Sequence, residues 1–85
     1  MTYTFRGMTI PEHMMLAIRR YIDDRVHPGD FLSAVIENDL REAVGRADDD
    51  NIRILPAYVA YLYNEAPGPC WGSTANMYSW LAGCS

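Results

Sequence analysis

Apolar side chains recur every three or four residues after Thr9, and this spacing predicts a first helix. Thr9 and Glu12 have the spacing of a capping box, and Pro11 suits the first turn of a helix. The segment His27-Pro28-Gly29 is expected to end the helix, because proline cannot continue the helical hydrogen bonds. The apolar stripe comprises Met14, Met15, Ile18, Ile22 and Val26.

A second helix is expected to begin with Asp30 as its N-cap and to run to about Ala47. Asn38 and Asp39 interrupt its apolar pattern between two turns, and Gly45 is expected to weaken its end. The face expected to be buried comprises Leu32, Val35, Ile36, Leu40, Ala43 and Val44.

Two further helices are predicted in the second half of the chain. The polar run 48–51 has the composition of a turn and helix cap, and an apolar helical pattern follows it. Pro56 favours a bend or a restart within this third helix, because proline is tolerated only in a first turn. Residues 66–72 are expected to be irregular, and Ser73 is expected to cap a short last helix that Gly83 closes. The third helix carries Ile52, Leu55, Tyr58, Val59, Leu62 and Tyr63, and the fourth turns Met77, Trp80 and Leu81 inward.

These patterns predict an all-α fold: a single small domain of about four helices over residues 1–85. Met1 to Arg6 alternate apolar and polar side chains before Gly7, so we expect residues 1–8 to form an extended N-terminal arm that packs on the domain or on a neighbouring subunit. The length of 85 residues allows one domain, and a hydrophobic fraction of 49% argues against intrinsic disorder.

Charge and cysteine content narrow the function classes. Eleven acidic residues against seven arginines, with no lysine, give a net charge of -4, which argues against generic nucleic-acid binding. The longest apolar runs are far below the ~18 residues of a membrane span, and the N-terminus lacks a signal-peptide pattern. Two cysteines, Cys70 and Cys84, are too few for a disulfide scaffold, so we expect a cytoplasmic protein.

No metal or cofactor is expected. His13, His27, Cys70 and Cys84 do not have the spacing of a metal site. An EF-hand loop starting at Asp48 would need Gly and Glu where this chain has Arg53 and Val59, so the three aspartates are better explained as a helix cap. Cys70 precedes a helix and could be a nucleophile with a histidine as its base, but a buried cysteine anchoring its loop is favoured.

Several segments together resemble a family of small, uncharacterised proteins encoded by tailed phages and prophages, over roughly residues 10 to 82. A phage origin implies a non-enzymatic protein in the host cytoplasm that counteracts a host defence or regulatory component by binding it. The segments are Pro28-Gly29-Asp30-Phe31-Leu32, Glu37-Asn38-Asp39-Leu40, Arg46-Ala47-Asp48, Leu62-Tyr63-Asn64, Ala66-Pro67 and Cys70-Trp71-Gly72-Ser73.

Two binding mechanisms remain open. A small nucleotide signal would be sequestered by arginines on its phosphates and by Tyr63 or Trp71 on its base. A host protein would instead be capped by the acidic face that includes Glu37, Asp39, Glu42 and residues 48–50. The alternatives are a small enzyme built on Cys70 and a structural accessory protein. The candidate binding residues are Arg41, Arg46, Asp48, Asn51, Arg53, Tyr63, Asn64, Trp71 and Ser73.

Two expectations qualify this candidate site. The same polar residues also suit helix caps and buried hydrogen-bond partners, which would give them a role in the fold alone. Six tyrosines and two tryptophans exceed what so small a core readily buries with their polar atoms satisfied. Tyr and Trp are common anchors of interfaces, so we expect a self-association surface and a homo-oligomer.

Overall fold

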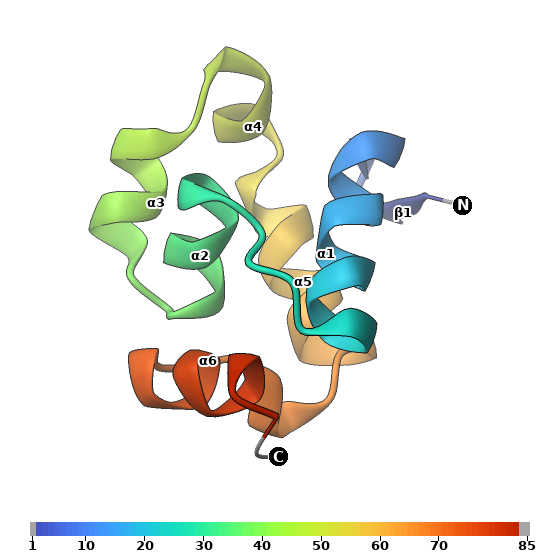
Figure 1. The fold of residues 1–85 in the computed structure, drawn as a ribbon. Coiled ribbons are helices and arrows are strands. Elements are labelled where there is room, and N and C mark those ends of the chain that lie inside the picture. The colour runs from blue at the N-terminus through green and yellow to red at the C-terminus, as the bar shows by residue number, and fades with distance from the viewer. Residues whose placement is uncertain (1, 84–85) are drawn as a thin grey trace.

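The computed structural model describes residues 2–83 and shows a mainly helical chain (Figure 1). The α-helices confirm the predicted helical character, whereas the two strands at the N-terminus were not expected. The elements are β1 (Tyr3–Phe5), β2 (Met8–Ile10), α1 (Glu12–Asp24), α2 (Asp30–Ile36), α3 (Leu40–Arg46), α4 (Asp49–Arg53), α5 (Leu55–Glu65), the 3-10 turn η1 (Gly68–Cys70) and α6 (Thr74–Leu81).

The expected N-terminal arm is a β-hairpin, in which β1 pairs antiparallel with β2 and packs against α5. Arg6 and Gly7 both have positive φ, 51° and 80°, as a tight hairpin turn requires. Thr9 belongs to β2 and its hydroxyl hydrogen-bonds that of Thr4 at 2.9 Å. The predicted capping box is therefore wrong: α1 follows Pro11, and no side chain of residues 2–83 caps its start.

The first helix ends earlier than its apolar pattern suggests. Arg25 has the left-handed conformation of a helix C-terminus (φ 60°), and this leaves Val26 exposed beyond the helix. The guanidinium of Arg25 lies 3.6 Å from the ring centroid of Trp80 and donates to the Trp80 carbonyl oxygen at 2.9 Å. The indole nitrogen of Trp80 in turn donates to the carbonyl oxygens of Tyr21 and Ile22, both at 3.1 Å. These bonds fasten α6 to the end of α1.

The predicted second helix is in fact two helices, α2 and α3. Asn38 has φ 63°, which stops α2, and the side chain of Asp39 accepts a hydrogen bond from the backbone N–H of Glu42 at 3.2 Å, which starts α3. Leu40 and Val44, both expected in the core, are 67% and 47% exposed, because the break turns α3 away from the direction of α2. Asp30 was expected as the N-cap of α2, but it is the first helical residue and Gly29 occupies the cap position.

Three predictions for the second half are confirmed. The side chain of Asp48 caps α4 by accepting from the N–H of Asn51 at 2.8 Å. The chain restarts as α5 with Pro56 in the first turn. The side chain of Ser73 caps α6 by accepting from the N–H of Asn76 at 3.0 Å. Residues 66–72 are irregular except for the turn η1.

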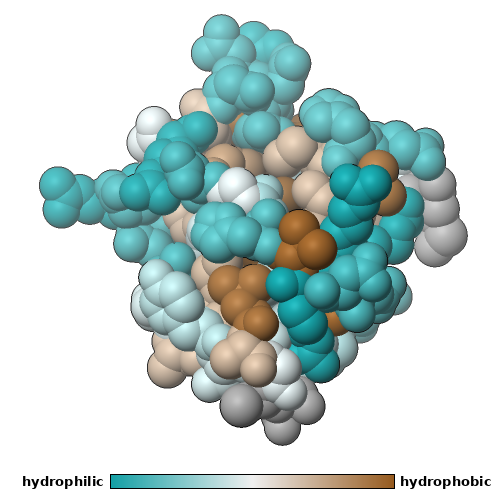
Figure 2. Space-filling view, in the orientation of Figure 1, coloured by the Kyte–Doolittle hydropathy of each residue, from teal (hydrophilic) through white to brown (hydrophobic). Residues whose placement is uncertain are grey.

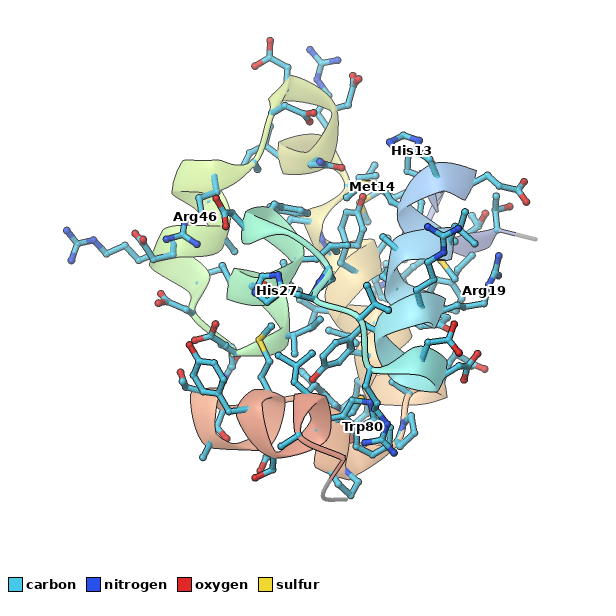
Figure 3. The ribbon with its side chains drawn as sticks, in the orientation of Figure 1. His13, Met14, Arg19, His27, Arg46 and Trp80 are labelled. Carbon is cyan, nitrogen blue, oxygen red and sulfur yellow. The ribbon has the colours of Figure 1, made fainter. Side chains whose placement is uncertain are left out.

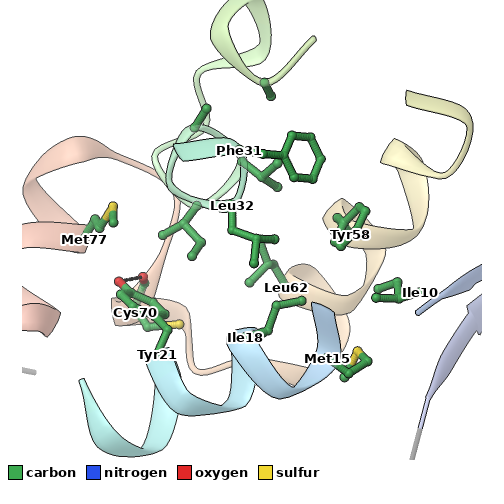
Figure 4. Close-up of a cluster of buried hydrophobic side chains, with 14 of the residues drawn as sticks. Ile10, Met15, Ile18, Tyr21, Phe31, Leu32, Tyr58, Leu62, Cys70 and Met77 are labelled. Carbon is green, nitrogen blue, oxygen red and sulfur yellow. Dashed lines mark hydrogen bonds between the residues drawn. The ribbon is translucent and has the colours of Figure 1, made fainter. Parts of the chain in front are cut away.

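Buried side chains gather in one cluster to which β2 and the helices α1, α2, α5 and α6 contribute (Figure 4). Tyr21 and Tyr58 are the largest side chains buried completely, and each hydroxyl donates a hydrogen bond. The Tyr21 hydroxyl reaches the Cys70 carbonyl oxygen at 2.7 Å, which ties the loop before α6 to α1. Among residues 2–83, every buried side-chain nitrogen and oxygen has a hydrogen-bond partner.

Candidate functional site

Three of the predicted binding residues serve the fold. The side chains of Asp48 and Ser73 are helix caps, each bound to a backbone N–H of its own helix. Asn51 is buried, and its side-chain oxygen accepts from the Tyr58 hydroxyl at 2.6 Å. These polar groups thus form hydrogen bonds within the protein, as the interpretation of the sequence as helix caps and buried hydrogen-bond partners predicted.

The structure does not gather the candidate phosphate-binding groups into one pocket. The guanidinium of Arg46 is held on α3 by Glu42 at 3.0 Å and by the Asp30 carbonyl oxygen at 3.4 Å (Figure 3). Arg41 and Arg53 are exposed on α3 and α4. Trp71 is half-buried in the loop before α6, where its carbonyl oxygen accepts from the Asn76 side chain at 2.8 Å.

Most carboxylates of the predicted acidic face form hydrogen bonds or an ion pair within the protein. Glu37 accepts from the Thr74 hydroxyl at 2.7 Å, Asp39 caps α3, and Glu42 pairs with Arg46. Of the three aspartates at 48–50, the second and third lie exposed in the first turn of α4. Figure 2 shows the face in view as mostly hydrophilic, with small hydrophobic patches near its centre and on its right side.

An apolar depression that is wide open to solvent runs along α5; it is here called the α5 groove and has a volume of about 630 Å³. Its floor is α5, and its walls are Phe5 of β1 and Leu40 of α3, which lie on opposite sides of α5 (Figure 1). A smaller hollow of about 30 Å³ continues it toward α2 and is lined in part by Asn38 and Asp39. The groove is lined by Phe5, Leu40, Leu55, Pro56, Val59, Ala60, Tyr63 and Asn64, all of them uncharged.

The groove brings large apolar side chains into contact with solvent. Leu40 is 67% exposed, Val59 43% and Tyr63 77%, and the last two lie one turn apart on α5, where they form a stripe. The β1 wall is held in place by Tyr3, whose ring packs edge-on to Tyr61 with centroids 5.2 Å apart. The packing of β1 on α5 therefore sets the position of this wall relative to the groove floor.

Two of the predicted site residues, Tyr63 and Asn64, line the α5 groove. Sequence reasoning missed Leu40 and Val59 as surface residues, because it assigned both to the apolar patterns of the second and third helices. The signal for Leu40 was Asp39-x-x-Glu42, which has the spacing of a helix start inside the expected second helix. Recognising it would have placed Leu40 at the first position of a new helix instead of within a continuous buried stripe.

Cys70 lies in surroundings that oppose catalysis by a thiolate. Its side chain is completely buried, and burial raises the pKa of the thiol above its ordinary value. The ring nitrogens of His27 are occupied by the N–H of Gly29 at 3.2 Å and by the Ser33 hydroxyl at 3.3 Å. Within residues 2–83, no three His, Cys, Asp or Glu side chains are grouped so as to hold a metal ion, and Cys84 lies outside the described residues.

Comparisons with known proteins give no match: none among protein-family models, none among curated proteins and none among solved structures. Over the described part of the chain, every helix is too short or too polar to cross a membrane. The functional argument therefore depends on the sequence and the surface of this protein.

Proposed function

We propose that the protein is a non-enzymatic binding protein of phage or prophage origin, which counteracts a host defence or regulatory component through a protein–protein contact at the α5 groove. The origin is supported by the resemblance of the sequence to small phage proteins. The mode of action is supported by one observation above all: an uncharged groove whose large apolar side chains face solvent. Apolar surface of this kind marks interaction sites in proteins that are otherwise polar outside.

The shape and chemistry of the groove favour a protein over a nucleotide as the bound partner. Phosphate groups are recognised by arginine forks or by the N–H groups at a helix start. The residues that line the groove supply neither an arginine nor a lysine, and Arg46 is already held by Glu42. Exposed Tyr63 has the character of an interface anchor, since aromatic side chains dominate the binding energy of protein interfaces.

The proposal is tested with a charge placed on the groove floor. Val59→Glu introduces a carboxylate that a protein partner would have to desolvate, and Leu16→Glu is its matched control. Leu16 lies on α1, is 44% exposed against 43% for Val59, and is absent from the groove lining. The readout is phage plating on a panel of bacterial strains that each carry one defence system, with the protein expressed from a plasmid.

We expect the wild-type protein and Leu16→Glu to restore plating on at least one strain, and Val59→Glu to lose this effect while remaining folded. Restoration by Val59→Glu equal to wild type would rule out the groove, and absence of restoration on every strain would rule out the counter-defence role. Arg46→Ala and Cys70→Ser are expected to retain the effect. Its loss in folded Arg46→Ala would support nucleotide sequestration, and its loss in folded Cys70→Ser would support an enzyme.

A further inference from the structure

The strand β1 has one open side, and that side borders the α5 groove. In the described part of the chain, β1 pairs with β2 alone. Phe5 of β1 lines the groove, whereas Met8, which lies opposite Phe5 on β2, does not, and β2 leads into α1. β1 therefore lies between β2 and the groove, and the side of β1 that faces away from β2 borders the groove.

The hairpin register shows which backbone groups lie on this open side. The two-residue turn after Phe5 has positive φ at both positions, 51° and 80°, so the flanking residues Phe5 and Met8 form the first hydrogen-bonded pair. Hydrogen-bonded and non-hydrogen-bonded pairs alternate along antiparallel strands, so the next pair, Thr4 and Thr9, is of the second kind. The backbone N–H and C=O of Thr4 therefore point away from β2, and those of Thr9 point away from β1.

We propose that the partner bound in the α5 groove contributes an extended segment, which adds to the open side of β1 as a third strand. This inference rests on the proposed role of the groove and specifies the kind of segment that the groove binds. In strand addition, main-chain hydrogen bonds hold the segment, and neighbouring pockets select its side chains. Here the main-chain bonds are made by the N–H and C=O of Thr4, and the apolar groove lies beside them.

The alternation of side chains along a strand defines the sequence pattern that fits. The rings of Tyr3 and Phe5 lie on the α5 side of the hairpin, where Tyr3 packs on Tyr61 and Phe5 lines the groove. Thr4 lies on the opposite, exposed face. The partner residue opposite Thr4 shares this exposed face, so its two neighbours point into the groove. Because the groove lining is uncharged, these two side chains are apolar, and the bound segment has the pattern apolar–polar–apolar.

An extended segment is favoured over a helix as the occupant. A helix satisfies its own backbone groups, so it would leave the outward N–H and C=O of Thr4 unused, whereas a strand forms hydrogen bonds with both. Proteins protect open strand edges with proline, charged side chains or bulges. The three residues of β1 include neither a proline nor a charged side chain, and their pairing with β2 is continuous.

The matched variants Thr4→Pro and Thr9→Pro test the strand edge. Each proline removes one outward N–H, and each substitution also breaks the hydrogen bond between the two threonine hydroxyls at 2.9 Å. Both residues are exposed, but only Thr4 lies on the strand that borders the groove. Proline is tolerated at a strand edge whose N–H faces solvent, so we expect both variants to remain folded by circular dichroism.

A displayed library of random 12-residue peptides supplies the probe, because peptides of this length can bind as strands or as helices. After selection on the wild-type protein, we expect the enriched peptides to share the apolar–polar–apolar alternation. In fluorescence anisotropy, Thr9→Pro and Leu16→Glu should bind them as wild type does, and Thr4→Pro and Val59→Glu roughly tenfold more weakly. Enriched peptides with the spacing of an apolar helix face, undiminished binding to Thr4→Pro, or no enrichment at all would overturn the inference.

N-methylation of a selected peptide tests the same hydrogen bonds without altering the protein. Methylating the amide that donates to the Thr4 carbonyl oxygen should weaken binding roughly tenfold. The amides of the two neighbouring peptide residues point away from β1 and should tolerate a methyl group. Equal sensitivity of all three amides, or insensitivity of all three, would contradict strand addition.

The outcomes separate this inference from the proposed function. In the plating assay, loss of the counter-defence effect in Val59→Glu but not in folded Thr4→Pro would mean that the groove holds a host protein in another conformation. Only the third strand would then be wrong. If the selected peptides bind as expected and no strain shows restored plating, the strand-binding site stands and the counter-defence role is wrong.

Discussion

One buried hydrogen bond joins the helices α4 and α5, and its removal should have a large and measurable cost. The Tyr58 hydroxyl donates to the side-chain oxygen of Asn51 at 2.6 Å, and both residues are buried. Tyr58→Phe removes the donor while keeping the ring, which packs edge-on to Phe31 with centroids 5.2 Å apart. The substitution therefore leaves the packing in place and deprives a buried oxygen of its partner.

The expected magnitude follows from the burial of that oxygen. A buried acceptor left without a donor costs about 1–3 kcal/mol, and we expect the free energy of unfolding to fall by about 2 kcal/mol. In a domain of this length, each kcal/mol lowers the melting temperature by roughly 4–8 °C, so Tyr58→Phe should melt roughly 8–16 °C below wild type.

The assay is urea and thermal denaturation followed by far-UV circular dichroism, with Tyr63→Phe as the control. Tyr63 lies on the same helix and loses the same atom, but its side chain is exposed, so we expect a change below about 0.5 kcal/mol. Tyr58→Phe combined with Asn51→Ala should cost less than the sum of the two single variants, because the second change removes the orphaned oxygen. Equal stabilities of Tyr58→Phe and Tyr63→Phe would refute the reasoning.

Three further predictions concern other buried or strained groups. Burial raises the pKa of both Tyr21 and Tyr58 above the ordinary value of about 10, so the folded state holds these protons at pH values where the unfolded state has lost them. Urea denaturation at a series of pH values should therefore show a stability that is kept below about pH 10 and falls above it, and the fall should be smaller in Tyr58→Phe. Asn38→Ala should lower the free energy of unfolding by about 1–2 kcal/mol because Asn38 has φ 63°, whereas Asn38→Gly should match or exceed wild type in thermal melts. Cys70 should react with iodoacetamide only after unfolding, as mapped by mass spectrometry, and rapid labelling of the native protein would contradict its burial.

Features governed by neighbouring residues could be predicted from the sequence. Ser73 starts α6 and Asp48 starts α4, because a short side-chain oxygen three residues before a free N–H is a local device. Pro56 marks the restart of α5 for an equally local reason. The candidate binding residues were less predictable, because Asp48, Asn51 and Ser73 have side chains that suit a cap, a buried bond or a ligand equally well.

The N-terminal hairpin could not be read from spacing alone, because the same residues satisfy two rules. Thr9 and Glu12 fit a capping box, but Thr9 also alternates with Met8 and Ile10 as a strand residue. The choice depends on β1, which is seven positions away at the Tyr3–Ile10 pair, and on the support that α5 gives to the hairpin. The pairing of β2 with β1 is favoured over a side-chain cap on α1, because the hairpin also buries Ile10 completely.

The break between α2 and α3 connects the fold to the proposed binding surface. In one unbroken helix, Leu40 would continue the stripe that begins with Leu32 and Ile36, four residues apart, and it would face the core. The left-handed turn at Asn38 redirects the chain, so Leu40 becomes a wall of the α5 groove and is 67% exposed. A large apolar side chain that the fold turns outward gains nothing for the monomer, since its exposure to water is unfavourable. A protein partner that covers Leu40 would recover this burial, so the same break that removes Leu40 from the core provides an apolar contact for the partner of the α5 groove.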